Sequence, residues 1–466
     1  MTEQSTSPIP FRPEDPAGLR ECLAALRPAG RELAGLPLPE LLGGLEQFGR
    51  LWQPGSDHFR RACSMLEGTL STRAVEESLT MLSLSLRGDV LLPELARELG
   101  RADLMDSWQA DEAGTGYSRG YPLGVVAQVL AGNVFLGGAV AIAQTLLTRN
   151  AVLVKLSRED SGFTSLFAGC LEELDPGGVL ARSIAVAAWS SEQDDLNQVL
   201  REEADGLVVW GGQAAIDAYP ADRCRGRVIH YGPRLGVGLL CDRVDLEQSL
   251  PALAWDIALW EQRACSSPRL LLVEDADGSG SLPRRVASEL SRALAGVREH
   301  LPARTLSLDE KSEVLSLREW ASWGDRARVF ASRRSMDHTV LLGSPVPQEI
   351  PLGYRTALVV PVDRVAKIPE LLAPYRTALQ TAVLAAPADR WPEAVRALVA
   401  AGMTQVVAAG SAASRFLGLP HEGEFALRRL VKLVGIDLGS GRLTCPGHRV
   451  DRAVVQRLKA GESTGR

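Results

Sequence analysis

The chain has 466 residues, of which 45% are hydrophobic and 23% charged, and its formal net charge is −6. This length suits two or three folded domains, and the apolar content is ordinary for a globular protein. A small net negative charge offers no global basic surface, so we expect neither nucleic acid nor an anionic membrane as a partner.

The seven cysteines are odd in number, widely spaced and without a CxxC pair. This pattern argues against a disulfide framework and against a zinc knuckle, and it predicts a reducing compartment, the cytoplasm. The polar, proline-rich start "MTEQSTSPIPFRPEDP" lacks the apolar core of a signal peptide.

Residues 17–110 predict mostly helices, because leucines recur there with a period close to 3.6. After them, strands rich in Val and Ala alternate with helices of similar length. The expected strands are 123–131, 151–157, 183–189 and 206–210, and the expected helices are 137–150, 161–174, 193–204 and 213–219. This alternation predicts βαβ units and a parallel sheet.

The stretch 120–148 carries no charge and is long enough to cross a membrane. The alternative is a buried strand, a glycine-rich turn and a buried helix. Asn133 and two glutamines disfavour a bilayer, and the glycines fall where a strand-to-helix turn needs them. We therefore predict no membrane span.

A second alternating block follows and predicts a second α/β unit. Its expected strands are 235–241, 269–274, 327–332, 339–342, 356–362, 381–386 and 404–409, and its expected helices are 245–262, 283–298, 367–374 and 391–401.

Glycine-rich turns and one lysine indicate a ligand site in the first block. "LAGNVFLGG" and "VVWGGQAAI" each join a strand to a helix, and Gly211 and Gly212 would allow a phosphate or a ring to approach the backbone. Lys155 ends a probable central strand, where open α/β sheets bind ligands, in a chain with five lysines. Tight turns without a ligand, and a surface lysine, remain the alternatives.

Cys265 lies in the polar loop "WEQRACSSP" between an expected helix and an expected strand. Loop exposure, the neighbouring Arg263 and backbone amides would favour a nucleophilic thiolate. A half-exposed, inert thiol is the alternative. The sequence contains neither a serine-hydrolase elbow nor a histidine cluster with metal-ligand spacing, so we expect no metal.

The order of these motifs is more specific than any one of them. From about residue 115 to 435, the series resembles the aldehyde dehydrogenase superfamily and, within it, the acyl-CoA reductase family of the bacterial luminescence fatty acid reductase (LuxC type). The blocks that carry the resemblance are "PLGVV…GN", "NAVLVKLS", "WGGQAAI", "YGPR", "WEQRACSSP", "LGYRTALVVPV", "YRTALQT" and "PHEGEF".

The resemblance implies an α/β fold with a Rossmann-type cofactor domain, an α/β catalytic domain and a small bridging element that supports a homo-oligomer. The implied division is 1–103 for the helical part of the cofactor domain, 104–122 for the bridging element, 123–233 for the dinucleotide-binding sheet, 234–435 for the catalytic domain and 436–466 for a C-terminal segment on the bridging or cofactor side.

The resemblance also implies roles for single residues. Cys265 would become acylated, Asn133 would donate its amide to the oxyanion, and His421 would donate a proton unless it is merely structural. The implied cofactor contacts are Lys155 to the ribose, Ser157 and Arg158 near the 2′-position, Gly211 and Gly212 near the pyrophosphate and nicotinamide, and Glu349 near the nicotinamide ribose. Arg158 favours NADPH over NADH.

Two departures from the superfamily pattern bear on the reaction. Tyr231 stands where oxidising members carry the glutamate that activates water, and Gly212 replaces a serine in the phosphate turn. Without that base an acyl-enzyme is not readily hydrolysed. We therefore predict an acyl-thioester reductase that uses acyl-CoA or acyl-carrier protein, with an acyl-transferring partner protein as a further candidate source. The alternatives are an oxidising or CoA-acylating aldehyde dehydrogenase and a non-catalytic scaffold.

Overall fold

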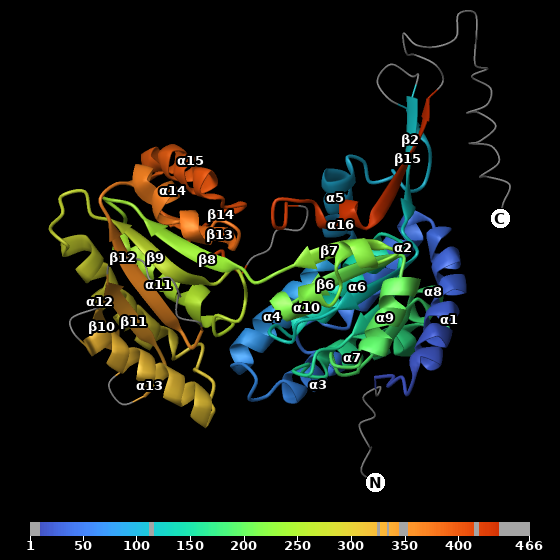
Figure 1. Cartoon of the computed structure of the whole chain (residues 1–466), viewed down its shortest axis with the longest axis horizontal. Coiled ribbons are helices and arrows are strands. Elements are labelled where there is room, and N and C mark those ends of the chain that lie inside the picture. The colour runs from blue at the N-terminus through green and yellow to red at the C-terminus, as the bar shows by residue number, and fades with distance from the viewer. Residues whose placement is uncertain are drawn as a thin grey trace, which may run out of the picture.

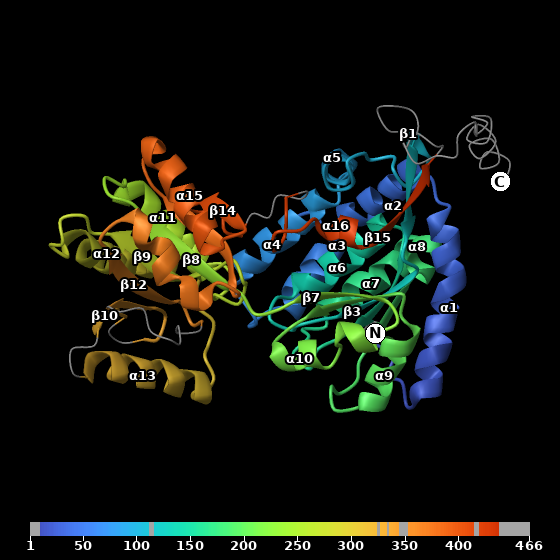
Figure 2. The same ribbon diagram turned by 45° about the horizontal axis from the view of Figure 1, so that its top comes forward.

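The computed structural model describes residues 10–110, 116–323, 327–332, 335–343, 353–413 and 419–437. Two α/β bodies lie side by side, and a narrow antiparallel sheet projects from the first of them (Figures 1 and 2).

The first body is built on a five-stranded parallel sheet with the order β5-β4-β3-β6-β7. Its strands are β3 (Val125–Val129), β4 (Ala151–Lys155), β5 (Ile184–Ala187), β6 (Gly206–Trp210) and β7 (Arg227–Tyr231). β3 and β4 are buried at every position, as expected for central strands covered on both faces. The chain winds from β3 out to β5 and then returns to the other side of β3. The carboxyl ends of β3 and β6 therefore border the crevice in which such sheets bind ligands.

Helices cover both faces of this sheet. One face carries α1 (Pro16–Ala34), α9 (Asp194–Glu203), α10 (Gln213–Asp217) and the short turn η1 (Ala221–Arg223), and the other carries α6 (Leu136–Leu147) and α7 (Phe163–Leu174). The short α8 (Val179–Arg182) contacts both α1 and α7.

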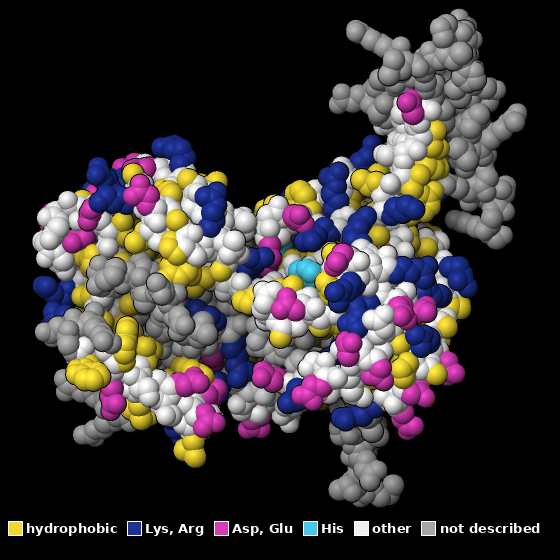
Figure 3. All heavy atoms as spheres, viewed as in Figure 1, with side chains coloured by type: hydrophobic (Ala, Val, Ile, Leu, Met, Phe, Trp, Pro, Cys, Tyr) yellow, Lys and Arg dark blue, Asp and Glu magenta, His cyan; other side chains and the backbone are white. Residues whose placement is uncertain are grey.

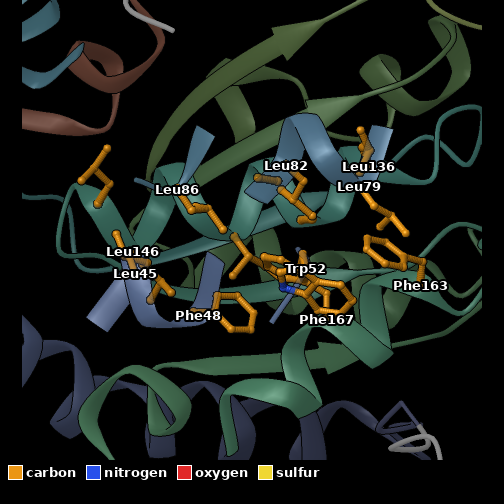
Figure 4. Close-up of a cluster of buried hydrophobic side chains, with 14 of the residues drawn as sticks. Leu45, Phe48, Trp52, Leu79, Leu82, Leu86, Leu136, Leu146, Phe163 and Phe167 are labelled. Atoms are coloured by element: carbon orange, nitrogen blue, oxygen red, sulfur yellow. The ribbon is translucent and has the colours of Figure 1, made fainter. Parts of the chain in front are cut away.

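An outer helical layer packs on α6 and α7. It consists of α2 (Leu38–Arg50), α3 (Asp57–Met65), α4 (Thr72–Ser85) and α5 (Gly88–Leu99). Its centre is an aromatic cluster in which Trp52 lies 5.3 Å from Phe163 and Phe48 lies 4.4 Å from Phe167, between ring centroids (Figure 4). Aromatic side chains that interlock in this way contribute a large share of the buried apolar area of a core.

The second body contains a seven-stranded sheet with the order β10-β11-β12-β9-β8-β13-β14, parallel except for β10. Its strands are β8 (Leu235–Leu240), β9 (Pro268–Glu274), β10 (Ala327–Ala331), β11 (Thr339–Gly343), β12 (Thr356–Val362), β13 (Leu379–Ala385) and β14 (Gln405–Ala408). One face carries α11 (Leu246–Ala258) and α12 (Ser281–Val297), and the other carries α13 (Leu308–Ser322), α14 (Ile368–Leu371) and α15 (Trp391–Ala401), with the turns η3 (Val365–Lys367), η4 (Ala373–Tyr375) and η5 (Ala388–Arg390).

The projecting sheet joins two segments that are far apart in the sequence. β2 (Gly116–Pro122) lies between β1 (Gln109–Ala110) and β15 (Val431–Asp437), and both neighbours are antiparallel to it. The helix α16 (Ala426–Arg429) leads into β15. The range 234–435 assigned to the catalytic domain thus ends inside β15, and most of 436–466 lies outside the described residues.

The charge-free stretch 120–148 forms the end of β2, then β3, a turn and α6, which is the strand–turn–helix arrangement expected from its glycines. Across the described part of the chain, no helix has both the length and the apolar character required to cross a bilayer.

The structure differs from the sequence-based elements at several places. The expected helix 245–262 ends at Ala258, and β7, α13 and β15 were not expected. The helix stops early because Glu261 and Gln262 adopt positive φ angles, which are outside the right-handed helical region.

Candidate active site

The loop between α11 and β9 carries Cys265, whose side chain is partly exposed. β8 lies directly beside the loop because residue 236 is glycine. A Cβ atom at Gly236 would lie 2.4 Å from the carbonyl oxygen of Ser267 and 2.9 Å from that of Ser266. Only glycine allows two backbones to approach this closely, so the sequence "LGV" after Arg234 sets the position of the loop.

Asn133 connects the crevice of the first sheet to this loop. Its side-chain nitrogen Nδ2 donates a hydrogen bond to the carbonyl oxygen of Arg263 at 2.8 Å. Asn133 follows β3, so the carboxyl edge of the first sheet faces the amino edge of the second sheet at this point. An amide nitrogen carries two hydrogens, and the bond to Arg263 uses one of them. The two residues predicted from the sequence to act on one carbonyl group are thus placed at the same junction.

Figure 3 shows that the surface is hollowed between the two bodies, with lysine and arginine side chains at the rim. Two of the arginines near Cys265 are Arg234 and Arg269. A hydrogen bond to Glu422 raises the pKa of Arg234, and a negative charge on Cys265 adds to this effect. Burial lowers the pKa of Arg269, and the charge on Cys265 opposes this shift. The positive charges of Arg234 and Arg269 are therefore both within electrostatic reach of Cys265.

Tyr231 is buried beside Trp210 at the ends of β7 and β6, and the two rings stack with centroids 4.0 Å apart. The guanidinium of Arg429 lies 5.6 Å from the centroid of the Tyr231 ring. Tyr231, which the resemblance aligns with the glutamate of the superfamily pattern, is therefore part of a stacked aromatic pair. His230, the residue before Tyr231, bonds through Nε2 to the carbonyl oxygen of Tyr219 at 2.9 Å.

His421 lies against this aromatic pair, with its ring 4.9 Å from that of Tyr231. Its Nε2 is 3.1 Å from Nε2 of Gln380. The next residue, Glu422, pairs with Arg234, which is within electrostatic reach of Cys265. The link from His421 to the surroundings of Cys265 thus runs through its neighbour Glu422 and the ion pair of Glu422 with Arg234.

The predicted cofactor contacts lie at the carboxyl edge of the first sheet. Lys155 is 6% exposed, its Nζ lies 5.1 Å from the ring centroid of Trp189, and burial lowers its pKa. Among the described residues it has no carboxylate partner, which suits a ribose hydroxyl or a phosphate oxygen as its acceptor.

The turns after β3 and β4 touch each other. A Cβ at Gly132 would lie 2.2 Å from Oγ of Ser157, which in turn accepts a hydrogen bond from the backbone N–H of Glu159 at 3.0 Å. Arg158 extends from the same turn and is exposed.

The turn after β6 also fits a dinucleotide. Gly211 has φ 155° and Gly212 is the N-cap of α10, with open space where a Cβ of Gly212 would point. These residues form a cradle that side chains would fill, so the site fits the predicted nicotinamide cofactor. Glu349, also predicted to contact the cofactor, lies outside the described residues.

A half-open cavity of about 340 Å³ borders the base of the loop, where Glu261, Arg304, Lys311 and Tyr354 line it. Neither Cys265 nor Asn133 lines this cavity, so it is distinct from the place where the thiol would react.

A family model of acyl-CoA reductases (LuxC) matches residues 33–433. The chain belongs to this family. The match confirms the family predicted from the ordered motifs.

Relatives of this LuxC-family protein include two "long-chain acyl-protein thioester reductases". The protein from Vibrio harveyi is 31% identical over 46% of this chain and 44% of its own length. The one from Photorhabdus luminescens is 27% identical over 72% of this chain and 68% of its own length. The chain thus spans less than half of the first relative and about two thirds of the second.

Solved aldehyde dehydrogenases share the fold of this LuxC-family protein. A salicylaldehyde dehydrogenase from Pseudomonas putida G7 superimposes with a TM-score of 0.70 over 93% of this chain and 92% of its own, at 13% identity. An acetylating aldehyde dehydrogenase from Geobacillus thermoglucosidasius gives 0.67 over 92% and 98%, at 12% identity. The predicted aldehyde dehydrogenase-like α/β fold is confirmed.

The sequence analysis does not single out several polar residues that hold the base of the Cys265 loop or pair beside it. They are Arg234, Gln262, Arg355 and Glu422. Each lies inside one of the blocks that carry the family resemblance, namely "YGPR", "WEQRACSSP", "LGYRTALVVPV" and "PHEGEF". Their place inside these blocks was the available signal.

Proposed function

We propose that this protein reduces an acyl thioester to an aldehyde through an acyl group held on Cys265. The observation that carries the proposal is the hydrogen bond from Asn133 to the carbonyl of Arg263. This bond brings an amide donor from the dinucleotide-binding edge of one sheet to the cysteine loop of the other.

In the first step the Cys265 thiolate attacks the carbonyl carbon of the thioester. The second N–H of Asn133 and the backbone N–H of Cys265 donate to the oxygen as it becomes negative. The carbon–sulfur bond to the carrier then breaks, and the carrier leaves as a thiolate that takes a proton from the solvent. The result is an acyl group in thioester linkage to Cys265.

In the second step the acyl carbon is reduced. When bound, the nicotinamide cofactor supplies the hydride for this reduction. Asn133 again donates a hydrogen bond to the acyl oxygen. His421 is the candidate to donate a proton to that oxygen and to take it back when the aldehyde forms. The carbon–sulfur bond to Cys265 then breaks, which releases the aldehyde and restores the thiolate.

The burial of Tyr231 supports reduction over hydrolysis. Its ring fills the place of the expected carboxylate and stacks on Trp210, so this position offers water no general base. Assays with acyl-CoA and NADPH, against aldehyde and NAD⁺, test the direction. We expect aldehyde and oxidised cofactor from the first mixture; faster turnover of the second to a free acid would favour an oxidising aldehyde dehydrogenase.

NADPH is the proposed reductant because Arg158 projects from the turn that follows Lys155. An arginine at this turn can pair with a 2′-phosphate, whereas NADH presents a neutral hydroxyl there. The acyl donor is proposed to be acyl-CoA or acyl-carrier protein, and the names of the two relatives add an acylated partner protein as a source. All six described cysteines are free, which fits a reducing cytoplasm.

The projecting sheet is the proposed surface for assembly into a homo-oligomer. Within the described residues β15 pairs on one side, with β2, and Leu433 on β15 is 47% exposed. A strand edge with an exposed apolar side chain is a common site for pairing with another chain. Light scattering after gel filtration should show an oligomer for the natural chain and a smaller species for Leu433→Glu; a monomeric natural chain contradicts this part.

A further inference from the structure

Two segments beside the nucleophile loop adopt a backbone conformation that side-chain-bearing residues rarely take. Glu261 and Gln262 have φ angles of 53° and 57°, and Tyr354 and Arg355 have 55° and 52°. These are four of the seven non-glycine residues with positive φ among the described residues. Left-handed backbone is unfavourable for a residue with a Cβ, so it persists where neighbouring contacts enforce it.

Gln262 supplies the first of these contacts. Its side chain is 0% exposed, and its nitrogen donates to the carbonyl oxygens of Pro268 at 2.9 Å and Thr356 at 2.8 Å. Its amide oxygen accepts from the backbone N–H of Thr356 at 2.7 Å. Pro268 and Thr356 begin β9 and β12, which are neighbours in the second sheet. Gln262 therefore fastens the base of the loop to the amino ends of two strands.

The ion pair between Arg355 and Glu261 supplies the second contact. Arg355 is 1% exposed, and its Nε and Nη2 donate to Oε1 of Glu261 at 3.1 and 2.5 Å. Its Nη1 also donates to the carbonyl oxygen of Leu301 at 2.9 Å. A buried charge pair with its hydrogen bonds satisfied is rigid, because moving either partner leaves a charge without compensation.

A chain of covalent neighbours leads from these contacts to the reacting atoms. Arg263 follows Gln262 directly, and its carbonyl oxygen accepts the hydrogen bond from Asn133. Cys265 comes two residues later. A rotation of the backbone at residues 261–262 would therefore move both the acceptor that orients the Asn133 amide and the thiol.

We propose that Gln262 and the Glu261–Arg355 pair are positioning residues that hold the strained loop so that the Cys265 thiol and the Asn133 amide reach the same carbonyl group. The kinetic consequence of this inference rests on the proposed function. Its effect on the reactivity of the thiol rests on the geometry alone.

Gln262→Met is the principal test, because methionine keeps the length of the side chain and removes its three hydrogen bonds. We expect the rate at which palmitoyl-CoA acylates Cys265 to fall about a hundredfold, since small displacements of reacting groups have effects of this size. The KM for NADPH should stay within about twofold, because the contacts of Gln262 are in the second body and the cofactor turns are in the first. Glu261→Gln keeps an acceptor oxygen for Arg355 and should give a smaller loss, about tenfold, by the same reasoning.

Arg149→Met is the matched control. Arg149 is 3% exposed, has φ 57° and pairs with Asp106, so it shares the burial, the backbone strain and the ion pair of Arg355. It lies in the first body, away from the Cys265 loop. We expect this variant to lose thermal stability while its folded fraction acylates Cys265 at the natural rate.

The pH profile of Cys265 alkylation by iodoacetamide gives a readout that does not depend on thioester chemistry. We expect the profile to move in Gln262→Met and Glu261→Gln and to stay unchanged in Arg149→Met. If the natural enzyme is not acylated but the two profiles move, the proposed function fails and the positioning role stands. If folded Gln262→Met is acylated and alkylated at the rates of the natural protein, the inference is wrong. If Gln262→Met does not fold, the same two rates measured in Glu261→Gln decide.

Discussion

Asn133 has a side chain that is already oriented before any substrate binds. Its Nδ2 donates to the carbonyl oxygen of Arg263 at 2.8 Å, which fixes the plane of the amide. The second N–H of the amide is then held in a fixed direction and is left for another acceptor. A donor that needs no reorientation is most effective in stabilising charge that develops during reaction.

Asn133→Ala tests this role. Removing one oxyanion donor typically costs about 3–4 kcal/mol, so we expect kcat for aldehyde formation to fall by roughly a hundredfold or more. Steady-state kinetics with acyl-CoA and NADPH provide the measurement. Near-normal turnover in the folded variant would show that Asn133 does not serve the oxyanion.

Arg158→Glu tests the choice of cofactor. A hydrogen bond from arginine to phosphate contributes about 1.5–3 kcal/mol, and a carboxylate at the same place repels phosphate. We expect kcat/KM for NADPH to fall by about ten- to a hundredfold, while the value for NADH falls little or rises. A uniform loss with both cofactors would mean that Arg158 does not contact the 2′-position.

At the scale of elements, the aromatic core of the helical layer holds the outer helices on the first body. Trp52 follows α2 and is fully buried against Phe163 and Phe167 (Figure 4). Its loss removes the packing between the end of α2 and α7.

Trp52→Ala should lower the free energy of unfolding by about 3–5 kcal/mol, the usual cost of truncating a buried aromatic side chain. Leu84→Ala on α4 is a suitable control, because Leu84 is 50% exposed and should change stability little. Thermal and urea unfolding of both variants provide the comparison, and equal stabilities would contradict the packing described.

How far the sequence predicts an element depends on whether its partners are local. β6 and β12 have the expected bounds, since continuous apolar runs between turn residues define buried parallel strands. β15 was not expected, because its sequence "VKLVGID" is only half apolar and its partner β2 is distant in the chain.

The same limit applies to the site. Cys265 stands out in the sequence by its polar loop, and the roles predicted for Cys265 and Asn133 come from the family resemblance. In contrast, the sequence predicts that Glu261 and Gln262 end a helix. In the structure they bond to Arg355 and Thr356, and these tertiary contacts hold both residues outside the helical region. Periodicity in the sequence carries no record of such distant bonds.

At the scale of the whole molecule, apolar packing and hydrogen bonds hold the two bodies together. They include the bond from Asn133 to Arg263 and the hydrogen bond from Nε1 of Trp260 to Oγ of Ser78 at 2.9 Å. Asp256 on α11 fixes the start of the segment that leads back to the first body, because its carboxylate accepts from the N–H groups of Gly410 and Ala412 at 2.7 and 3.0 Å.

Asp256 should make stability depend on pH. Burial raises its pKa from 3.8 to about 7, so the folded protein holds this proton more tightly than the unfolded chain does. Its contribution to stability is therefore present below about pH 4 and is lost as the pH rises through about 7. We expect the thermal midpoint of the natural protein to decline more steeply between pH 5 and 8 than that of Asp256→Asn. Parallel slopes would contradict the raised pKa.

The central claim is that Cys265 carries an acyl group that is reduced before it is hydrolysed. Intact-mass analysis after mixing the protein with palmitoyl-CoA, first without and then with NADPH, tests it most directly. We predict one acyl adduct, absent in Cys265→Ala and retained in Cys224→Ser, that persists without NADPH and disappears on its addition with an equal amount of aldehyde. An adduct that decays to free acid without NADPH, or no adduct on Cys265 at all, would contradict the account.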